Sequence, residues 1–277
     1  MKILKNGILV LLSILVVLPF LFTVLNAFMG SEEFYEYYGW LNRDEAVYLA
    51  FHLFPDKWSF EAFVTVLLSA PDYLMKFWNS LGITTAIAGG QIFVSCLAGY
   101  GFSKFRFPGR YPLFVLVILL MMMPYQVTLV SNYIMLDRLG LIGSYGAVIL
   151  PGIFSSFGVF LMKQVMDGIS KEVLEAARLD GAGQLRVLLS VALPISKGGI
   201  ASLLVLNFID NWNMVEQPLV FLKDSSMYPL SIFLADSIQE SGMEIFACGV
   251  LAMLPVLLLF AYFRDELISG ISASELK

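Results

Sequence analysis

The residues whose types and spacing are most informative in this chain favour protein binding over catalysis. Segment 175–181 begins Glu-Ala-Ala and ends in glycine, and segment 191–194 reads Val-Ala-Leu-Pro. A charged, amphipathic segment has little reason to interrupt a membrane-embedded chain unless a partner in the aqueous phase binds it. We therefore predict that a partner protein docks on Glu175, Ala176, Ala177, Arg178, Asp180, Gly181, Leu193 and Pro194.

Local signals predict a short helix with two different faces at this segment. Ser170 can cap its start, while Ile169 and Leu174 occupy the N′ and N4 positions of a hydrophobic staple. Gly181 stands where a residue in the left-handed conformation would end the helix. The helix is expected to resume from 185 to 192, and Leu193-Pro194 with Gly198-Gly199 is expected to break it before the fifth span. On a wheel of about 100° per residue, the apolar face comprises Val173, Leu174, Ala176 and Ala177.

The alternative is an amphipathic helix that rests on the inner leaflet of the membrane. Ala176 and Ala177 weaken this alternative, because a helix on a lipid surface gains from large apolar groups. Paired alanines instead permit the close approach of another protein surface.

Residues that could do covalent or metal chemistry are few. His52 is the single histidine, and neither histidine, cysteine nor carboxylate residues form a cluster with metal-ligand spacing. The sequence contains no Gly-x-x-x-x-Gly-Lys-Ser/Thr phosphate loop, so ATP hydrolysis would have to be supplied by another subunit. We predict a non-enzymatic chain with no catalytic residue, no metal site and no cofactor of its own. Cys96 and Cys248 are expected to be small buried apolar residues.

The composition identifies the elements that must position the docking segment. Of the 277 residues 58% are hydrophobic and 14% charged, and the mean hydropathy is +0.80, far from the values of soluble domains. A helix needs roughly 20 apolar residues to cross the hydrocarbon layer. We therefore predict an all-α polytopic membrane protein that forms one domain over residues 1–277. Its six spans are expected at about 8–29, 77–102, 111–130, 145–166, 198–222 and 245–263.

The distribution of lysine and arginine predicts the orientation. Most of the 17 cationic residues lie on one side of the membrane if the N-terminus is cytoplasmic, which places both termini inside. The first run exceeds the length of a signal-peptide core, about 7 to 15 residues, and is expected to remain as an anchor. Segment 30–76 becomes a long acidic and aromatic outer loop, and segment 167–197 becomes the cytoplasmic loop that contains the docking residues.

Polar residues in the fifth predicted span are candidates for a translocation path. Ionisable groups inside a membrane are costly and by default face a bundle interior or an aqueous path. Interhelical hydrogen bonding is an equally good explanation. In the third span, Met121-Met122-Met123-Pro124 predicts a flexible apolar kink. The path candidates, which would suit hydroxyl-rich substrates, are Asn207, Asp210, Asn211, Asn213 and Gln217.

Taken together, these motifs resemble the permease subunits of binding-protein-dependent ABC importers. One pattern is similar to their cytoplasmic signature: Glu-Ala-Ala, three residues, Gly, nine residues, and then an aliphatic residue before x-Leu-Pro. The similarity covers about 77 to the C-terminus, with departures at Ser170, Val191 and Met214. Further motifs resemble the carbohydrate-uptake branch: Asn79-Ser80-Leu81, the segment 100–110, Leu139-Gly140-Leu141, Trp212-Asn213 and Pro218-Leu219.

The resemblance implies a six-helix permease of the type I importer fold in a bacterial cytoplasmic membrane. It implies that segment 167–197 holds a coupling helix seated in a groove of a cytoplasmic ATPase, with Glu175 facing basic residues there. The implied partners are a similar but distinct second permease, two ATPase copies that bind ATP and Mg, and an extracytoplasmic binding protein that delivers a sugar or oligosaccharide. Membrane lipid surrounds the complex, and no nucleic-acid partner is expected. The alternatives are an importer of a non-sugar solute or a self-sufficient secondary transporter or channel, which would show matching halves with broken helices.

Overall fold

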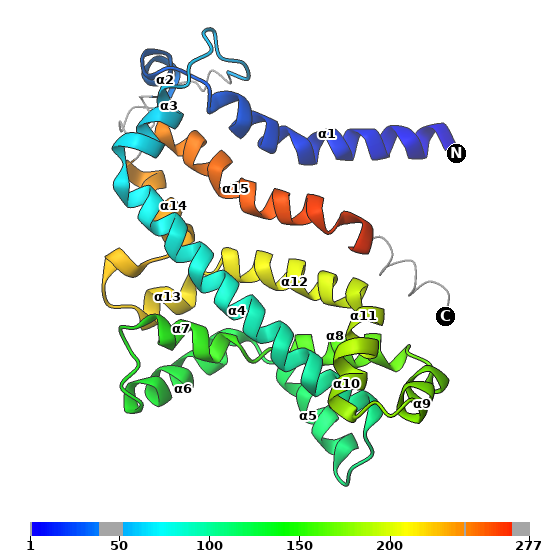
Figure 1. Ribbon diagram of the computed structural model, residues 1–277. Coiled ribbons are helices and arrows are strands. Elements are labelled where there is room, and N and C mark those ends of the chain that lie inside the picture. Colours follow the sequence, from blue (N-terminus) through cyan, green and yellow to red (C-terminus); the bar gives the residue numbers. More distant parts are fainter. Residues whose placement is uncertain (1, 39–51, 241, 268–277) are drawn as a thin grey trace. The chain divides into compact units, whose positions relative to one another are not determined.

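The computed structural model describes residues 2–38, 52–240 and 242–267, and its regular elements over these ranges are all helical (Figure 1). The chain forms two compact units. Unit 1 contains Met1–Trp78 and Leu230–Pro255, and unit 2 contains Asn79–Pro229 and Val256–Lys277. Each unit is described by itself. The expectation of a single membrane domain stays a prediction.

Unit 1 is built from α1 (Lys2–Asn26), α2 (Ser31–Tyr38), α3 (Glu61–Val64), η1 (Thr65–Ser69), α14 (Leu230–Glu240), the start of α4 (Pro71–Lys104) and most of α15 (Glu244–Tyr262). Aromatic rings form much of its core: Phe246 lies 5.7 Å from Phe22 and 6.2 Å from Phe34, edge to face. The Tyr73 hydroxyl donates to the Cys248 carbonyl at 3.3 Å. Most side chains of α1 are exposed and apolar, as expected for a helix whose solvent is lipid.

Unit 2 contains the remainder of α4 and the helices α5 (Arg110–Met121), α6 (Tyr125–Arg138), α7 (Tyr145–Gly152), α8 (Ser156–Asp167), α9 (Lys171–Leu179), α10 (Gln184–Val187), η2 (Leu188–Ala192), α11 (Leu193–Ile195), α12 (Lys197–Trp212), α13 (Glu216–Phe221) and η3 (Ser225–Met227). Close contact between α4 and α8 requires glycine. A Cβ atom added at Gly99 would lie 2.8 Å from the backbone nitrogen of Lys163. Small residues let two helices approach closely where lipid provides no hydrophobic driving force between them.

Within the described residues, four helices are long and apolar enough to cross a membrane, and two bent helix pairs raise the number of candidate spans there to six at most. The third and fifth predicted spans were wrong as single helices. Segment 111–130 is divided between α5 and α6, which meet at 103°, so the kink predicted at Met121–Pro124 is confirmed. Pro124 lacks an N–H and directly precedes α6. Cytoplasmic placement of the two termini stays a prediction.

The fifth predicted span, 198–222, ends early. α12 stops at Trp212, and the Ile209 carbonyl accepts two hydrogen bonds from Asn213: one from its backbone N–H at 3.2 Å and one from its side chain at 2.8 Å. A separate helix, α13, follows with Pro218 in its first turn. The break predicted from Leu193-Pro194 and Gly198-Gly199 is confirmed: it lies at Ser196, between the two pairs, where the α10–α11 segment and α12 are bent by 76°. Pro194 is tolerated because it stands at the start of α11.

Two hydrophobic clusters form the core of unit 2. The α8 cluster joins α4, α8, α9, η2 and α12. The α7 cluster contains Ile87, Val148 and Phe221, and it also contains Met214 at 9% exposure. Met214, one of the positions at which the sequence departs from the family pattern that it resembles, thus packs in this core. The α8 cluster comprises Cys96, Tyr100, Met162, Met166, Ile169, Leu174, Val187, Leu188, Ala192 and Leu203. As expected, Cys96 and Cys248 are buried free cysteines.

Candidate functional site

The start of α9 is positioned by a staple and by one charged residue. Ile169 and Leu174 both belong to the α8 cluster, so the predicted hydrophobic staple is confirmed. Ser170 occupies the N-cap position, but among the described residues its side chain accepts no capping hydrogen bond. The carboxylate of Glu172 instead accepts hydrogen bonds from its own backbone N–H and from the Ser170 hydroxyl, which lowers the pKa of Glu172. A carboxylate in the first turn also complements the helix dipole.

The end of α9 follows the predicted turn. Gly181 has φ +84°, in the left-handed region. Its N–H donates to the Arg178 carbonyl at 3.0 Å, and the N–H of Ala182 donates to the Ala177 carbonyl at 3.1 Å. These two bonds are the pair that defines a Schellman motif, so the last carbonyls of α9 are satisfied. The helix therefore ends sharply at Gly181, as the sequence predicted.

The exposed surface of α9 differs from the predicted division into two faces. Leu174 is only 3% exposed, and Ala177 packs against the α8 cluster. Val173 and Ala176, which were expected on the same buried face, are exposed. So short a helix touches the core along one line of residues three positions apart, and residues beside that line remain uncovered. Apolar and charged groups therefore share the open surface of α9: Val173, Glu175, Ala176, Arg178, Leu179 and Asp180.

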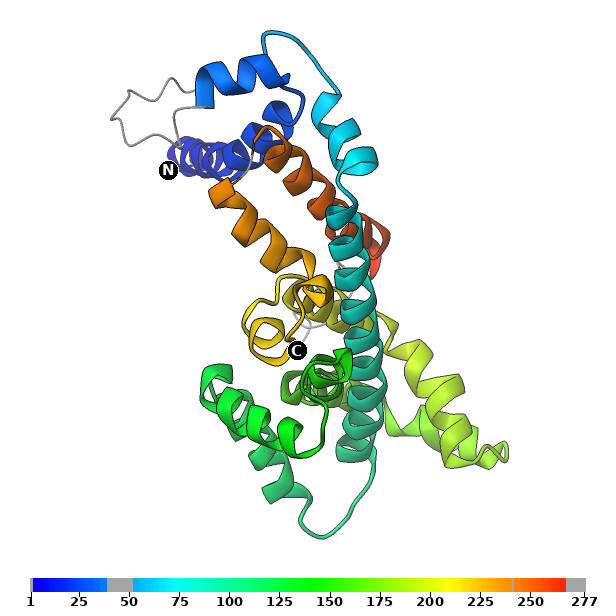
Figure 2. The ribbon, with the colours of Figure 1, turned by 90° about the vertical axis from the view of Figure 1, so that its left-hand side faces the viewer.

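The second part of the predicted docking segment lies on the following helices. Figures 1 and 2 show the yellow-green segment α9–α10 projecting beside the end of α4 that contains Lys104. Leu193 is partly buried against the α8 cluster, whereas Pro194 is exposed. Close packing holds the start of α12 against α8, because a Cβ added at Gly199 would meet the side chain of Val165 at 2.5 Å. The segment predicted to dock a partner is thus tied to the bundle through one shared core.

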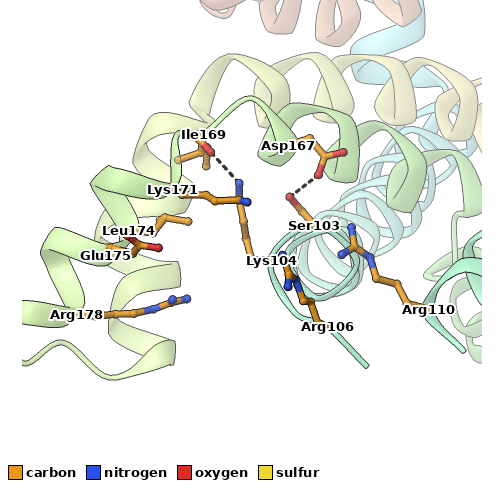
Figure 3. Close-up of a pocket in the computed structure, with 10 residues that line it drawn as sticks. All are labelled: Ser103, Lys104, Arg106, Arg110, Asp167, Ile169, Lys171, Leu174, Glu175 and Arg178. Carbon is orange, nitrogen blue, oxygen red and sulfur yellow. Dashed lines mark hydrogen bonds between the residues drawn. The ribbon is translucent and has the colours of Figure 1, made fainter. Parts of the chain in front are cut away.

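A charged pocket of about 480 Å³ opens between the end of α4, the loop after it and α9 (Figure 3). Two hydrogen bonds join its walls: Lys104 Nζ donates to the Ile169 carbonyl at 2.8 Å, and Ser103 Oγ donates to Asp167 Oδ1 at 2.7 Å. Lys163 pairs with Asp167 Oδ2 at 2.6 Å. Cations outnumber acids in the lining, which comprises Ser103, Lys104, Arg106, Arg110, Asp167, Ile169, Lys171, Leu174, Glu175 and Arg178.

This pocket was not predicted from the sequence. The cations of the 103–110 segment were attributed to topology, and nothing in their spacing indicated that Lys104 would hold the carbonyl that precedes α9. A lysine at the end of one helix can hydrogen-bond a free backbone carbonyl elsewhere. Lys104 and the Ile169 carbonyl become neighbours only when α4 and α8 are packed together, so the sequence alone gives no sign of this bond. The consequence is that α9 is connected to α4 as well as to its sequence neighbours.

The polar residues of the fifth predicted span do not form one stripe. Asn207 is buried, and among the described residues its Nδ2 atom has no hydrogen-bond partner. Asn211 donates to the Asn207 carbonyl at 2.6 Å and to Gln91 Oε1 of α4 at 3.4 Å. Asp210 is exposed on another side of α12. Because α12 ends at Trp212, Asn213 and Gln217 lie beyond that helix, and the Gln217 side chain hydrogen-bonds Tyr125.

The Gln91 side chain satisfies a backbone carbonyl at the break between α7 and α8. Its Nε2 donates to the Gly152 carbonyl at 2.7 Å, in the last residue of α7 before the chain turns into α8. A carbonyl released by a helix break inside a membrane needs such a partner. The Gln91–Asn211 bond therefore belongs to an interhelical network, the alternative that the sequence left open.

A cofactor or metal ion would have to be bound by groups outside the charged pocket and the polar residues of α12. In the described part of the chain, one group of three metal-ligating side chains lies close together: Glu33, His52 and Asp56. This group belongs to unit 1, whereas α9, the charged pocket and the polar residues of α12 belong to unit 2.

Comparison with known proteins identifies the family. Residues 91–272 match the model of the binding-protein-dependent transport system inner membrane component. This chain belongs to that family. It is therefore a permease of a binding-protein-dependent import system, and the matched residues include α9, the charged pocket and α12.

Two characterised relatives match over most of their length. The permease protein AraQ of an arabinooligosaccharide transport system in Bacillus subtilis is 31% identical over 228 residues, which are 80% of each chain. The permease protein UgpE of an sn-glycerol-3-phosphate transport system in Yersinia enterocolitica is 34% identical over 212 residues, which are 75% of each chain. Both relatives are permeases, as the sequence motifs indicated.

Solved structures share the fold. A crystal structure of a bacterial ABC transporter involved in import of the acidic polysaccharide alginate contains a chain with a TM-score of 0.80 and 19% identity, and the match covers 95% of both chains. A second alginate transporter structure, in complex with a periplasmic protein that binds an alginate pentasaccharide, gives 0.57 at 18% identity over 75% of this chain and 82% of the other. The permease fold of an ABC importer is thus present over nearly the whole chain.

Proposed function

We propose that this permease forms half of the translocation path of an ATP-driven importer and takes a neutral sugar or oligosaccharide from an extracytoplasmic binding protein. The single observation that carries the proposal is α9, a helix that ends in a Schellman turn and has an open surface, within the residues matched to the family. In this assembly a second, similar permease completes the path, and two ATPase copies bind ATP and Mg. The chain itself carries out no chemical reaction.

The docking proposal follows from the open surface of α9. Val173 is 44% exposed and Leu179 is 89% exposed, which is costly in water and suits a protein groove. Glu175 and Arg178 extend from the same helix and supply the charges that would orient a partner. The excess of cations in the neighbouring pocket favours an acidic group from the ATPase there, while Glu175 faces basic residues on the partner.

Force transmission follows from the contacts behind α9. Leu174 sits in the α8 cluster, and Lys104 joins the start of α9 to α4. A displacement of α9 by the ATPase would therefore move α4, α8 and α12 as one packed body instead of bending a loop. Rigid-body movement of this kind is a common form of switching between two states.

The substrate class is proposed from the relatives and from the charge of the candidate path. The relatives are named for arabinooligosaccharides and for sn-glycerol-3-phosphate, both rich in hydroxyl groups. Asp210 and Glu216 are exposed, and Gln126 donates to both carboxylate oxygens of Glu216, at 3.0 and 3.1 Å. Carboxylates beside a path would repel an anionic solute, so a neutral sugar fits better than a phosphate ester. Asp210 is the main candidate for this role, and Asn213 and Gln217 are further polar candidates.

A bacterial cytoplasmic membrane with both termini inside is the location that suits this assembly. Under this orientation the charged pocket and α9 face the cytoplasm, where an ATPase is present, and segment 30–76 faces the binding protein.

The docking function is tested by charge reversal and by helix disruption on α9. Glu175→Lys and Gly181→Pro should leave membrane insertion intact while abolishing ATPase co-purification and solute uptake. Asp137→Lys, the same reversal at an exposed residue of α6, is the control and should retain both. Retained uptake in both α9 variants would remove α9 from the mechanism.

The rival function is a self-sufficient transporter. Proteoliposomes that contain this chain alone should show no solute accumulation under a proton or sodium gradient. Accumulation without the ATPase would overturn the importer assembly and support the secondary transporter instead.

A further inference from the structure

Three side chains of unit 1 converge at a point that includes no residue of α9, of the charged pocket or of α12. Glu33 lies on α2, while His52 and Asp56 lie on the segment that follows residues 39–51. His52 Nε2 is 3.6 Å from Glu33 Oε1 and 3.5 Å from Asp56 Oδ1. One ligand atom from each of the three residues lies within 4.8 Å of the others. We propose that Glu33, His52 and Asp56 bind one divalent transition-metal ion, and that Zn²⁺ fits them best.

The distances between donor atoms suit a small metal ion. Zn²⁺ binds imidazole nitrogen and carboxylate oxygen at about 2.0–2.1 Å in tetrahedral geometry, which separates neighbouring donors by about 3.3 Å. The observed separations of 3.6 and 3.5 Å between His52 Nε2 and the two carboxylate oxygens need only a small contraction to reach that value. The two carboxylate oxygens lie within 4.8 Å of each other, and rotation of the exposed Asp56 side chain can adjust their spacing. Three protein ligands leave one position for water. Asp56 has a side chain 65% exposed, so solvent and an incoming ion can reach the site.

The imidazole nitrogen that faces the two carboxylates makes no hydrogen bond to another described group. His52 Nε2 is buried, and within the described residues no group hydrogen-bonds it. Its separations from the two carboxylate oxygens exceed the usual N–H···O range. A buried polar atom without a hydrogen bond is costly, and one cation between the three groups would satisfy all of them. The arrangement is therefore better suited to an ion than to a direct His–carboxylate hydrogen bond.

Hydrogen bonds behind the three residues hold them in place. The Tyr37 hydroxyl donates to Asp56 Oδ2 at 3.2 Å, and the Tyr37 ring stacks on the imidazole of His52 with 4.0 Å between centroids. The backbone N–H of Asp56 donates to Glu33 Oε1 at 2.6 Å, and the Tyr38 hydroxyl donates to the His52 carbonyl at 3.2 Å. Outer contacts of this kind orient the first ligands in metal sites and raise their affinity.

The ligand chemistry selects the class of ion. Mg²⁺ and Ca²⁺ prefer sites built from oxygen alone, whereas one imidazole with two carboxylates suits Zn²⁺ and its neighbours in the transition series. Two carboxylates bring two negative charges to the site, which a divalent ion cancels. In the sequence the ligands lie on both sides of residues 39–51, so an ion would join α2 to segment 52–56. Spacing along the sequence predicted no metal site, because the ligands become neighbours only when this chain returns to α2.

The proposal is tested by metal binding to the full chain in detergent, purified without a polyhistidine tag, stripped with a chelator and desalted. Calorimetric titration with ZnCl₂ should show one saturable site per chain, with Mg²⁺ and Ca²⁺ binding at least about tenfold more weakly. Glu33→Gln, His52→Gln and Asp56→Asn should each lower Zn²⁺ affinity by about tenfold or more. Glu32→Gln is the matched control, since Glu32 is an exposed neighbour on the same helix and should bind like the wild type.

A fourth variant keeps the test independent of folding defects. Tyr37→Phe retains all three ligands and the ring stacked on His52, and it removes only the hydroxyl bound to Asp56. Its Zn²⁺ affinity should fall by about tenfold. Zn²⁺ should also raise the thermal midpoint of the wild type and of Glu32→Gln, but not that of His52→Gln.

Two results would overturn the metal site. One is the absence of a saturable Zn²⁺ site in the stripped wild-type chain, or an equal loss of affinity in Glu32→Gln. The other is a thermal midpoint that depends on pH through His52 and is unchanged by Zn²⁺ or chelator, which would make the cluster a histidine–carboxylate ion pair.

Discussion

α9 and α12 belong to the same packed unit, yet they use their polar residues in opposite ways. α9 contacts the α8 cluster mainly through Leu174 and Ala177, and its charged side chains extend from the surface. α12 is packed between neighbours, and Asn211 donates to Gln91 and to the Asn207 carbonyl. Polar groups on α9 are thus available to a partner, whereas much of the polarity of α12 is consumed within the bundle. A polar residue in a membrane helix indicates function only after its internal partners are known.

The largest effect on the stability of α9 is expected at Leu174, the residue that anchors this helix in the α8 cluster. Leu174→Ala removes a buried side chain from the α8 cluster and should lower the free energy of local opening of α9 by about 2–4 kcal/mol. Hydrogen exchange of the α9 amides measures this change. Leu179→Ala is the control, because that side chain is 89% exposed, and it should alter exchange by less than about 0.5 kcal/mol. Equal effects in the two variants would show that α9 is not anchored through Leu174.

The next largest effect on the stability of α9 is expected at Gly181, where the helix ends. Gly181 has φ +84° and open space around the position of a Cβ, so Gly181→Ala introduces backbone strain without a steric clash. The cost should be about 1–2 kcal/mol in the same hydrogen-exchange experiment.

Gly183→Ala is the matched control. Gly183 has φ −66°, which alanine adopts easily, and a Cβ there also meets nothing within 4 Å. This variant should be neutral or slightly stabilising. A similar loss at both positions would contradict the Schellman turn as the feature that ends α9.

The link between α9 and α4 should have a smaller effect on stability than on coupling. Lys104→Met removes the hydrogen bond to the Ile169 carbonyl, at about 1 kcal/mol. ATPase co-purification should persist, because the open surface of α9 is unchanged, while solute transported per ATP hydrolysed should fall. Lys171→Met, an exposed lysine of the same pocket, should retain this ratio. An unchanged ratio in Lys104→Met would show that α9 transmits movement without this link.

The smallest effect on stability is expected within α12. Asn211→Ala removes an interhelical hydrogen bond, and bonds of this kind in membrane bundles contribute about 0.6 kcal/mol on average. Its KM for uptake should remain near the wild-type value. Asp210→Asn should instead change KM, because Asp210 is exposed and is the candidate for the path. A shift in KM for Asn211→Ala but not for Asp210→Asn would reverse the roles proposed for these residues.

Parts of the molecule governed by local rules were predicted well. The staple of Ile169 and Leu174, the turn at Gly181 and the kink at Pro124 depend on residues within a few positions of one another, and all three are confirmed. The end of α12 was missed, although Asn213 could have indicated it, because an apolar run of sufficient length appeared to continue. Apolar length shows that a segment can lie in a membrane, but it does not show where backbone hydrogen bonds stop.

The sequence by itself determined that this is a helical membrane permease with a short, charged helix that ends at Gly181, because composition, periodicity and turn residues act over short distances along the chain. Only the tertiary structure decided which polar groups remain free. It pairs Asn211 with Gln91, ties Lys104 to the carbonyl before α9, and brings Glu33, His52 and Asp56 to one point. Each of these contacts joins residues that are distant in the chain. The cost of leaving a buried polar group unpaired selects such partners only after the helices have packed.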